Sequence, residues 1–326
     1  MPQCVAKAVQ AAIFLLLKST GWEYSDKDGK DLPFAELFAA LGIRFNVGNL
    51  HLSQSTVENK PERVKSVVET VKQIIENGTF NHFEAEELRG KNQFMEKSIF
   101  GRAGRCIVQV YDRRGKSKLD DEDVKDLKWL VEWLETAKPR KLTPMVELPT
   151  VLLFTDGACE PNLVSCGAVL YDPLHDEVLM FGFEVNELLV QEWRTSGKEQ
   201  LVTEAELLPQ LVARVAWGDR LLHRKVINFV DSNPALYACI KGNSPALHCN
   251  NIVKAISIAD VGAGIWPWYT RVPSLSNCAD APSRLKGMPQ TWNGLKVIEC
   301  KVQQPTSLLR GKWTGSSAIL GIEKRG

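Results

Sequence analysis

The chain lacks several features that define other classes of protein. None of its eight cysteines stands in a C-x-x-C pair, so neither a zinc ribbon nor a disulfide scaffold is indicated. No apolar run approaches the roughly 18 residues that a membrane-spanning helix needs. Single cysteines favour a reducing compartment, which predicts a cytoplasmic or nuclear protein with no membrane partner.

A signal peptide is also not indicated. The N-terminal stretch V-A-K-A-V-Q-A-A-I-F-L-L-L resembles a short signal core, but Lys7 and Gln10 interrupt it. No small-residue cleavage site follows it. A buried helix is therefore the favoured interpretation of this segment.

Charges of the two signs nearly cancel, but they are unevenly distributed. Residues 151–283 hold 9 Lys/Arg against 15 Asp/Glu, a net of −6. Residues 89–118 hold 9 against 2, a net of +7, and residues 284–326 hold 8 against 2, a net of +6. An acidic module between basic stretches suits a metal centre whose anionic substrate is held by cations. Solvated charge on helix faces explains either basic stretch alone equally well.

A proline-rich linker at 137–150 separates two kinds of pattern. Before it, helical periodicity predicts helices that begin at Pro61, near Phe83 and after Asp120. After it, strands and helices alternate, which predicts an α/β domain with a mixed sheet and flanking helices. Its expected strands are 151–155, 166–171, 178–185, 226–230 and 265–272, and its expected helices are 204–217, 233–240 and 279–285. Residues 286–326 are basic and weakly periodic, and we expect a loose tail.

Four acidic residues stand where strand and helix signals meet. Asp156 and Asp231 each follow an apolar strand, and α/β sheets bind ligands at the carboxyl ends of their strands. Glu206 lies near the apolar face of a predicted helix, and Asp280 precedes the last helical turn. Taken singly, a turn or a helix cap explains each aspartate. Glu204 is the alternative to Glu206, on a different face of the same helix.

Taken together, these acids predict a metal centre. Carboxylates from several elements form the hard oxygen sites that Mg²⁺ or Mn²⁺ prefers. Two such ions can drive phosphodiester hydrolysis. The predicted ligands are Asp156, Glu206, Asp231 and Asp280.

The segment from Leu148 to Leu285 resembles the ribonuclease H domain of retroelement reverse transcriptases, such as those of gypsy-type and DIRS-type elements. The last matching block is the most specific, because an Asn-x-Ala-Asp-x-x-Ser-Arg ending closes many such domains. The matching residues are Phe154-Thr155-Asp156-Gly157-Ala158, Ala205-Glu206-Leu207, Val230-Asp231-Ser232 and Asn277-Cys278-Ala279-Asp280-Ala281-Pro282-Ser283-Arg284.

Upstream residues are similar to other parts of the same polyprotein. Residues 38–45 are similar to the strands that close a polymerase palm, and residues 84–102 resemble a thumb or connection segment. The resemblance implies a palm-like end at 1–58, a helical thumb- or connection-like domain at 59–136 and a ribonuclease H-like domain at 151–285.

The resemblance also implies an activity and its partners. The domain would use two Mg²⁺ ions, or Mn²⁺, to hydrolyse the RNA strand of RNA–DNA hybrids. Selectivity for the hybrid would rest on 2′-hydroxyl contacts and groove shape. The residues expected to contact nucleic acid are Arg89, Lys91, Arg102, Arg105, Asn277 and Arg284.

Two departures from the family limit what is expected. Polymerisation needs paired aspartates at a strand turn, and the only Asp-Asp here, Asp120-Asp121, begins a helix, where acids favour the helix dipole. Polymerase activity is therefore not expected, and a separate polymerase-bearing chain would be a partner. Cellular ribonucleases H carry a histidine in a flexible loop before the last acid, but here no histidine lies between His248 and Asp280. Proton transfer would then fall to metal-bound water, or the enzyme would be slower.

Two alternatives to an active hybrid nuclease stay open. One is an inactive nucleic-acid-binding remnant of a reverse transcriptase. The other is a different nuclease on the same fold, such as a 3′–5′ exonuclease or a transposase-like enzyme.

Overall fold

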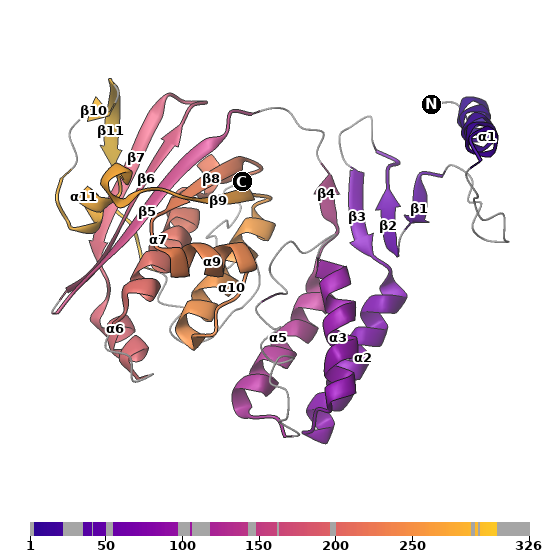
Figure 1. Ribbon diagram of the computed structural model, residues 1–326, viewed down its shortest axis with the longest axis horizontal. Helices are drawn as coiled ribbons and strands as arrows, with labels where there is room; N and C mark the ends of the chain where they lie inside the picture. Colours follow the sequence, from indigo (N-terminus) through magenta and orange to yellow (C-terminus); the bar gives the residue numbers. More distant parts are fainter. Residues whose placement is uncertain are drawn as a thin grey trace, which may run out of the picture. The chain divides into compact units, whose positions relative to one another are not determined.

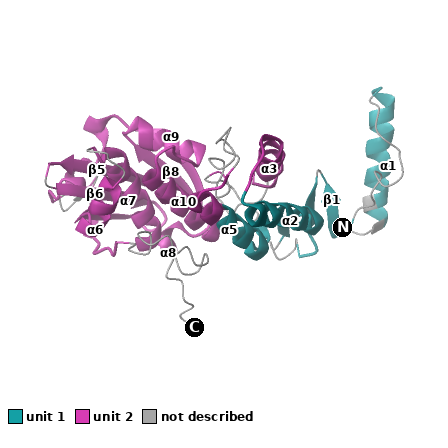
Figure 2. Ribbon diagram, turned by 90° about the horizontal axis from the view of Figure 1, so that it is seen from below, with its two compact units in different colours: residues 1–78, 127–144 teal, residues 79–126, 145–326 magenta. Residues whose placement is uncertain are grey.

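The chain forms two compact units in a computed structural model (Figure 2). One unit comprises Met1–Gly78 and Leu127–Pro144, and the other comprises Thr79–Asp126 and Met145–Gly326. The chain therefore passes from one unit to the other after residues 78, 126 and 144. The structure describes residues 3–21, 35–40, 42–49, 55–96, 105, 118–142, 148–161, 163–195, 200–287, 291–292 and 294–304.

The first unit contains a four-stranded antiparallel sheet in the order β1-β2-β3-β4. The hairpin between the first two strands turns at Gly42, whose φ of 78° suits a residue without a side chain. Strand β4 arises inside the predicted linker and lies at the sheet edge, where nearby prolines are tolerated. The strands are Leu37–Ala40 (β1), Ile43–Asn46 (β2), Ser55–Asn59 (β3) and Arg140–Leu142 (β4).

Two of the predicted helices accompany this sheet. Helix α2 (Pro61–Asn77) begins at the proline and ends at Gly78 in a left-handed conformation, as predicted. Lys72 of α2 pairs with Glu135 of α5 (Asp121–Thr136) at 2.7 Å, which places the two helices side by side. Their buried apolar residues are Val67, Val68, Val71, Ile74, Leu127, Trp129, Leu130, Val131 and Leu134.

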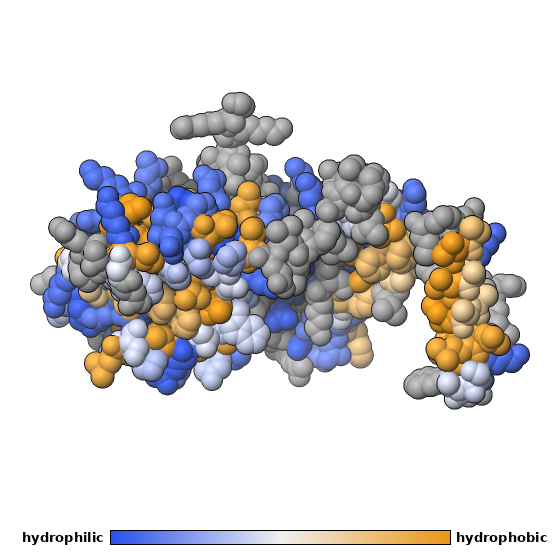
Figure 3. All heavy atoms as spheres, turned by 90° about the horizontal axis from the view of Figure 1, so that it is seen from above, coloured by the Kyte–Doolittle hydropathy of each residue, from blue (hydrophilic) through white to orange (hydrophobic). Residues whose placement is uncertain are grey.

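The N-terminal segment is helical, but the expectation that it is buried was wrong. In α1 (Gln3–Ser19) the apolar side chains lie on the surface, and Leu15 is 70% exposed. Figure 3 shows these side chains as an apolar stripe on the helix at the right. Within the described parts of the chain, no helix is long and apolar enough to span a bilayer.

The second unit begins with α3 (His82–Met95), close to its predicted start. Asn81 accepts a hydrogen bond from the backbone N–H of Glu84, and the Glu84 side chain accepts one from the backbone N–H of Asn81. This capping box fixes where the helix begins.

The main element of the second unit is a seven-stranded mixed sheet in the order β10-β11-β7-β6-β5-β8-β9 (Figure 1). Strand β6 is antiparallel to both of its neighbours, whereas β5, β8 and β9 are parallel. The sheet confirms the predicted fold class. Its strands are Val151–Glu160 (β5), Leu163–Asp172 (β6), Glu177–Glu184 (β7), Lys225–Val230 (β8), Trp266–Arg271 (β9), Thr291–Trp292 (β10) and Leu295–Glu299 (β11).

The large core lies on one face of this sheet. Residues such as Leu153, Ala168 and Phe181 of the sheet pack there with residues of five helices, α6, α7, α8, α9 and α10. Helix α6 is short and was not predicted. The helices of this unit, besides α3, are Glu187–Arg194 (α6), Val202–Ala216 (α7), Gly218–Leu221 (α8), Asn233–Lys241 (α9), Leu247–Gly262 (α10), the 3₁₀ turn Ser274–Ser276 (η4) and Asp280–Ser283 (α11).

Part of the predicted loose tail belongs to the sheet. Strand β11 pairs in parallel with β7, Val297 opposite Val178. Trp292, Leu295 and Val297 pack against a small apolar cluster on the other face of the sheet. This burial explains the order of a segment whose sequence pattern is weak.

Candidate metal centre

Two parallel strands place two of the predicted acids side by side. Phe154 of β5 pairs with Phe229 of β8, and their rings stack with centroids 4.4 Å apart. Side chains two residues further along a strand point to the same face. Asp156 and Asp231 therefore both follow the aromatic pair on one face, at the point where β8 ends.

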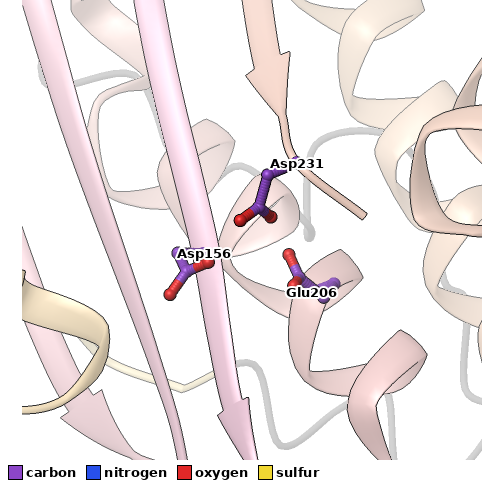
Figure 4. A group of neighbouring side chains, drawn as sticks. All are labelled: Asp156, Glu206 and Asp231. Carbon is purple, nitrogen blue, oxygen red and sulfur yellow. The ribbon is translucent and has the colours of Figure 1, made fainter. Parts of the chain in front are cut away.

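The third acid comes from helix α7, which approaches β5 very closely. A Cβ at Gly157 would lie 2.3 Å from the backbone of Ala205, so only glycine permits this approach. The next helical residue, Glu206, meets the two aspartates. Ligand oxygens of Asp156, Glu206 and Asp231 all lie within 4.8 Å of one another (Figure 4).

The structure distinguishes between the two glutamates of α7. Both Glu204 and Glu206 are buried. Glu206 contributes to the acidic group, and Glu204 does not. Helical geometry explains this, because residues two positions apart face different directions.

Crowding and burial favour the protonated forms of two of these acids. Burial raises the pKa of Glu206 to about 9, helped by the charges of Asp156 and Asp231. Burial likewise raises the pKa of Asp156 to about 6, opposed by a hydrogen bond from Ser283. A bound cation would stabilise the ionised forms of these carboxylates, which burial disfavours.

The donor set fits a divalent cation. Two buried oxygens, Glu206 Oε2 and Asp231 Oδ1, accept no hydrogen bond. Buried polar atoms are rarely left without a partner, and an ion bound in solution is one explanation of such an exception. Asp156, Glu206 and Asp231 would hold Mg²⁺ or Mn²⁺ through hard carboxylate oxygens.

Asp280, the fourth predicted ligand, lies outside this group of three. Its carboxylate accepts a hydrogen bond from Arg284 Nε at 2.9 Å, and its side chain is half exposed. Its negative charge still contributes to the raised pKa of Asp156, which shows that it lies nearby. Arg284, predicted to contact nucleic acid, is thus held by Asp280 on the surface.

The side chain of Asn277 makes its hydrogen bonds inside the protein. It is 5% exposed, and its Nδ2 donates to the backbone oxygen of Thr155 at 3.0 Å. Its Oδ1 accepts from the backbone N–H of Ala279 at 3.2 Å. These bonds join the segment before α11 to β5, one residue from Asp156.

The other predicted nucleic-acid contacts lie away from the acidic group in the sequence, and the structure describes three of the four. Arg105 pairs with the buried Glu96 at 2.9 Å and donates to the backbone oxygen of Lys241 at 3.3 Å. Lys91 pairs with Glu87 one helical turn away, and Arg89 is half buried. Arg102 lies outside the described residues.

A buried arginine behind the site was missed by the sequence reasoning. Arg214 of α7 donates to Asp260, Gln210, Asn228 and Tyr269 at 2.8–3.1 Å. Burial, the largest single effect, lowers its pKa, but the charge of Asp260, the hydrogen bond to it and the nearby Tyr269 together raise the pKa above its usual value. An arginine inside the otherwise apolar run Leu211–Ala216 was the available signal.

This arginine network reaches the metal centre. Gln210 Nε2 donates to Thr155 Oγ1 at 2.7 Å, and Thr155 immediately precedes Asp156. The network therefore joins α7, α10, β8 and β9 to the strand that carries the first acid.

The strand order and directions define the second unit as an α/β fold with a mixed sheet and flanking helices. No family model matches the chain, and no curated protein matches it by sequence. Similar solved structures include RNase H1 of the halophilic archaeon Halobacterium salinarum NRC-1, with 18% identity and a TM-score of 0.33 over 42% of this chain and 96% of that one. LC11-RNase H1 in complex with an RNA/DNA hybrid gives 18% identity and a TM-score of 0.28 over 42% of this chain and 95% of that one.

A similarity over more of the chain is to a viral protease-reverse transcriptase. The foamy viral protease-reverse transcriptase in complex with double-stranded DNA is 14% identical, with a TM-score of 0.32. It covers 80% of this chain, which in turn spans 41% of the viral chain.

Proposed function

We propose that residues 151–285 form a metal-dependent endonuclease that hydrolyses the RNA strand of RNA–DNA hybrids. We further infer descent from the reverse transcriptase region of a gypsy- or DIRS-like retroelement. The observation that carries the activity is the meeting of Asp156, Glu206 and Asp231 within 4.8 Å. The retroelement origin is supported by the closing block from Asn277 to Arg284.

The chain's own residues define the site. Asp156 and Asp231 approach from two parallel strands, and Glu206 completes the group from α7. Two bound divalent cations would supply activated water and stabilise charge on the leaving oxygen. The protein would hold three converging carboxylates in a rigid, largely buried frame, so little reorganisation accompanies binding.

Substrate contacts are expected from basic residues outside the cluster. Arg284 lies on the surface next to Asp280, where it can exchange its carboxylate partner for a phosphate. The basic stretch 89–118 would hold the duplex backbone through salt-sensitive phosphate contacts. Selection of the hybrid would depend on groove shape and 2′-hydroxyl groups.

The second candidate is a nucleic-acid-binding remnant without catalysis. The pairing of Asp280 with Arg284, outside the group of three acids, favours it. A remnant would bind duplexes in a salt-dependent manner but would not cleave them when Mg²⁺ or Mn²⁺ is added.

One experiment decides between the candidates. The purified full chain is incubated with end-labelled RNA–DNA hybrid, duplex DNA or single-stranded RNA, with Mg²⁺, Mn²⁺ or EDTA. We expect cation-dependent cutting of the hybrid RNA, and a loss of at least about 100-fold in Asp231→Asn. Asp176→Asn, in an exposed turn between β6 and β7, is the matched control. Cutting that Asp231→Asn leaves unchanged would rule out the proposed site.

A further inference from the structure

Helix α11 lies against the sheet at a place where the sheet has no side chains. Gly167 of β6 pairs with Asp156 of β5 and with Gly182 of β7. A Cβ at Gly167 would lie 2.2 Å from the backbone nitrogen of Ser283, and one at Gly182 would lie 2.3 Å from the backbone oxygen of Pro282. The two glycines thus form a platform on which the backbone of α11 rests beside Asp156.

Ser283 of α11 is fully buried on this platform. Its hydroxyl donates to Asp156 Oδ2, and the backbone oxygen of Asp280 lies 2.9 Å from the same hydroxyl. A hydroxyl has one proton to donate, and an ionised carboxylate is the stronger acceptor. The bond to Asp156 is therefore the one that the ionised site favours.

The contact occupies one of the two oxygens of Asp156. In Figure 4 one oxygen of this carboxylate points toward Glu206 and Asp231, and the other points away from them. A carboxylate held at one oxygen cannot rotate freely about its last torsion, which is otherwise broad. The other oxygen, Oδ1, is then left to bind a cation, and the orientation of the whole carboxylate is fixed.

We propose that Ser283 is a positioning residue that holds the Asp156 carboxylate in its cation-binding orientation, and so couples the seating of α11 to cation affinity. The inference rests on the proposed metal centre and says how one of its ligands is held in place. Hydrogen-bond partners behind metal ligands commonly set affinity in this way.

The competing explanation is that Ser283 only holds α11 against the sheet. The chain contains a control for this, because Ser165 of β6 is equally buried and donates to the backbone oxygen of Ser283 at 2.6 Å. Ser165→Ala removes a buried hydrogen bond to the backbone of α11, and that bond does not involve the Asp156 carboxylate. Ser283→Ala removes the bond to Asp156 and keeps the bond from Ser165, which goes to the backbone.

The test is a titration of the full chain with Mn²⁺ alone. Binding is measured by calorimetry and, independently, by the loss of the paramagnetic signal of free Mn²⁺. We expect Ser283→Ala to weaken Mn²⁺ binding about tenfold or more, and Ser165→Ala to leave it within about twofold. In an Asp156→Asn background, Ser283→Ala should have no further effect, because the partner it acts through is altered.

Each other outcome counts against the inference. Equal weakening in both serine variants would reduce Ser283 to a seating role, and unchanged binding in Ser283→Ala would remove its role altogether. Absence of Mn²⁺ binding by the wild-type chain would overturn it as well. If the wild type binds Mn²⁺ but cuts no hybrid, the proposed activity fails, while the comparison of the two variants still decides the role of Ser283.

Discussion

Phe154 stacks on Phe229 across β5 and β8, and this pair sets the register that brings Asp156 and Asp231 together. The two aspartates are distant in sequence: Asp156 lies within β5, which continues to Glu160, and Asp231 follows the last residue of β8. Because β5 and β8 are parallel neighbours, the two side chains lie next to each other at the carboxyl end of β8. The third acid depends on a different contact, that of Gly157 with α7.

The first prediction separates the two glutamates of α7. Glu206→Gln should reduce cation-dependent hydrolysis by about 100-fold or more, because it removes one of three converging carboxylates. Glu204→Gln should keep activity within about threefold, since Glu204 is not part of the group. The measurement is the initial rate of hybrid cleavage at saturating Mg²⁺, with thermal unfolding to confirm that both variants fold. The reverse order of effects would transfer the ligand role to Glu204.

The second prediction concerns stability without metal. The pKa of Glu206 is raised from 4.5 to about 9, and that of Asp156 from 3.8 to about 6. As pH rises past the unfolded values, the unfolded chain loses protons that the folded chain keeps. The raised pKa values therefore contribute their full share of the free energy of unfolding at low pH. This contribution falls as pH rises toward 9, by at most about 1.4 kcal/mol per pH unit for each group.

Urea unfolding in EDTA measures this slope. Between pH 6.5 and 8.5 the wild type should become less stable, and Glu206→Gln should flatten the decline. Glu187→Gln, at an exposed position in the first turn of α6, is the control and should keep the wild-type slope. Stability that rises over this range would contradict the raised pKa of Glu206.

A feature of this site could be predicted from the sequence where it depends on residues close together in the chain, and not where it depends on residues far apart. The predicted end of a strand before Asp156 was wrong, because pairing with β6 continues β5 to Glu160. The two apolar runs are local signals, and they were enough to predict that Asp156 and Asp231 lie side by side on neighbouring strands. The orientation of Glu206 is less local, because periodicity places both glutamates on α7 without showing which one meets β5. The pairing of Asp280 with Arg284 depends on how α11 is seated, and no spacing rule predicts that.

Two further elements escaped prediction for a similar reason. Strand β11 is ordered by parallel pairing with β7 and by burial of Val297, both of which join distant segments. Arg214 stands among apolar residues, and only the fold brings Asp260 and Asn228 to it. The mixed sheet was predictable because alternation and apolar runs are local, whereas the polar network behind it is not.

The third prediction tests that network. Arg214→Met should destabilise the protein by about 3–5 kcal/mol, because it leaves Asp260 buried without its guanidinium partner. Arg220→Met breaks a partly exposed pair with Glu177 at 2.7 Å and should cost less than about 1 kcal/mol. Urea unfolding of both variants gives the comparison. Equal costs would mean that the buried network adds little.

The fourth prediction concerns the glycine platform under α11. Gly167→Ala places a methyl group 2.2 Å from the backbone nitrogen of Ser283, and backbone cannot yield as a flexible side chain can. The helix should lift from the sheet, carrying Ser283 away from Asp156, so Mn²⁺ affinity and stability should fall together. Gly218→Ala, where nothing lies within 4 Å, is the matched control and should be neutral or slightly stabilising, since alanine favours a helix.

Hydrogen exchange locates the effect of the methyl group. In Gly167→Ala the amides of Ser283 and Arg284 should exchange faster than in the wild type, while those of β8 keep their protection. Loss of Mn²⁺ affinity with unchanged exchange in α11 would mean that the methyl group disturbs Asp156 through the strand. If Mn²⁺ affinity and the amide protection of α11 fall together, cation binding depends on the contact of α11 with the sheet, because Gly167, Ser283 and Asp156 then respond as one unit.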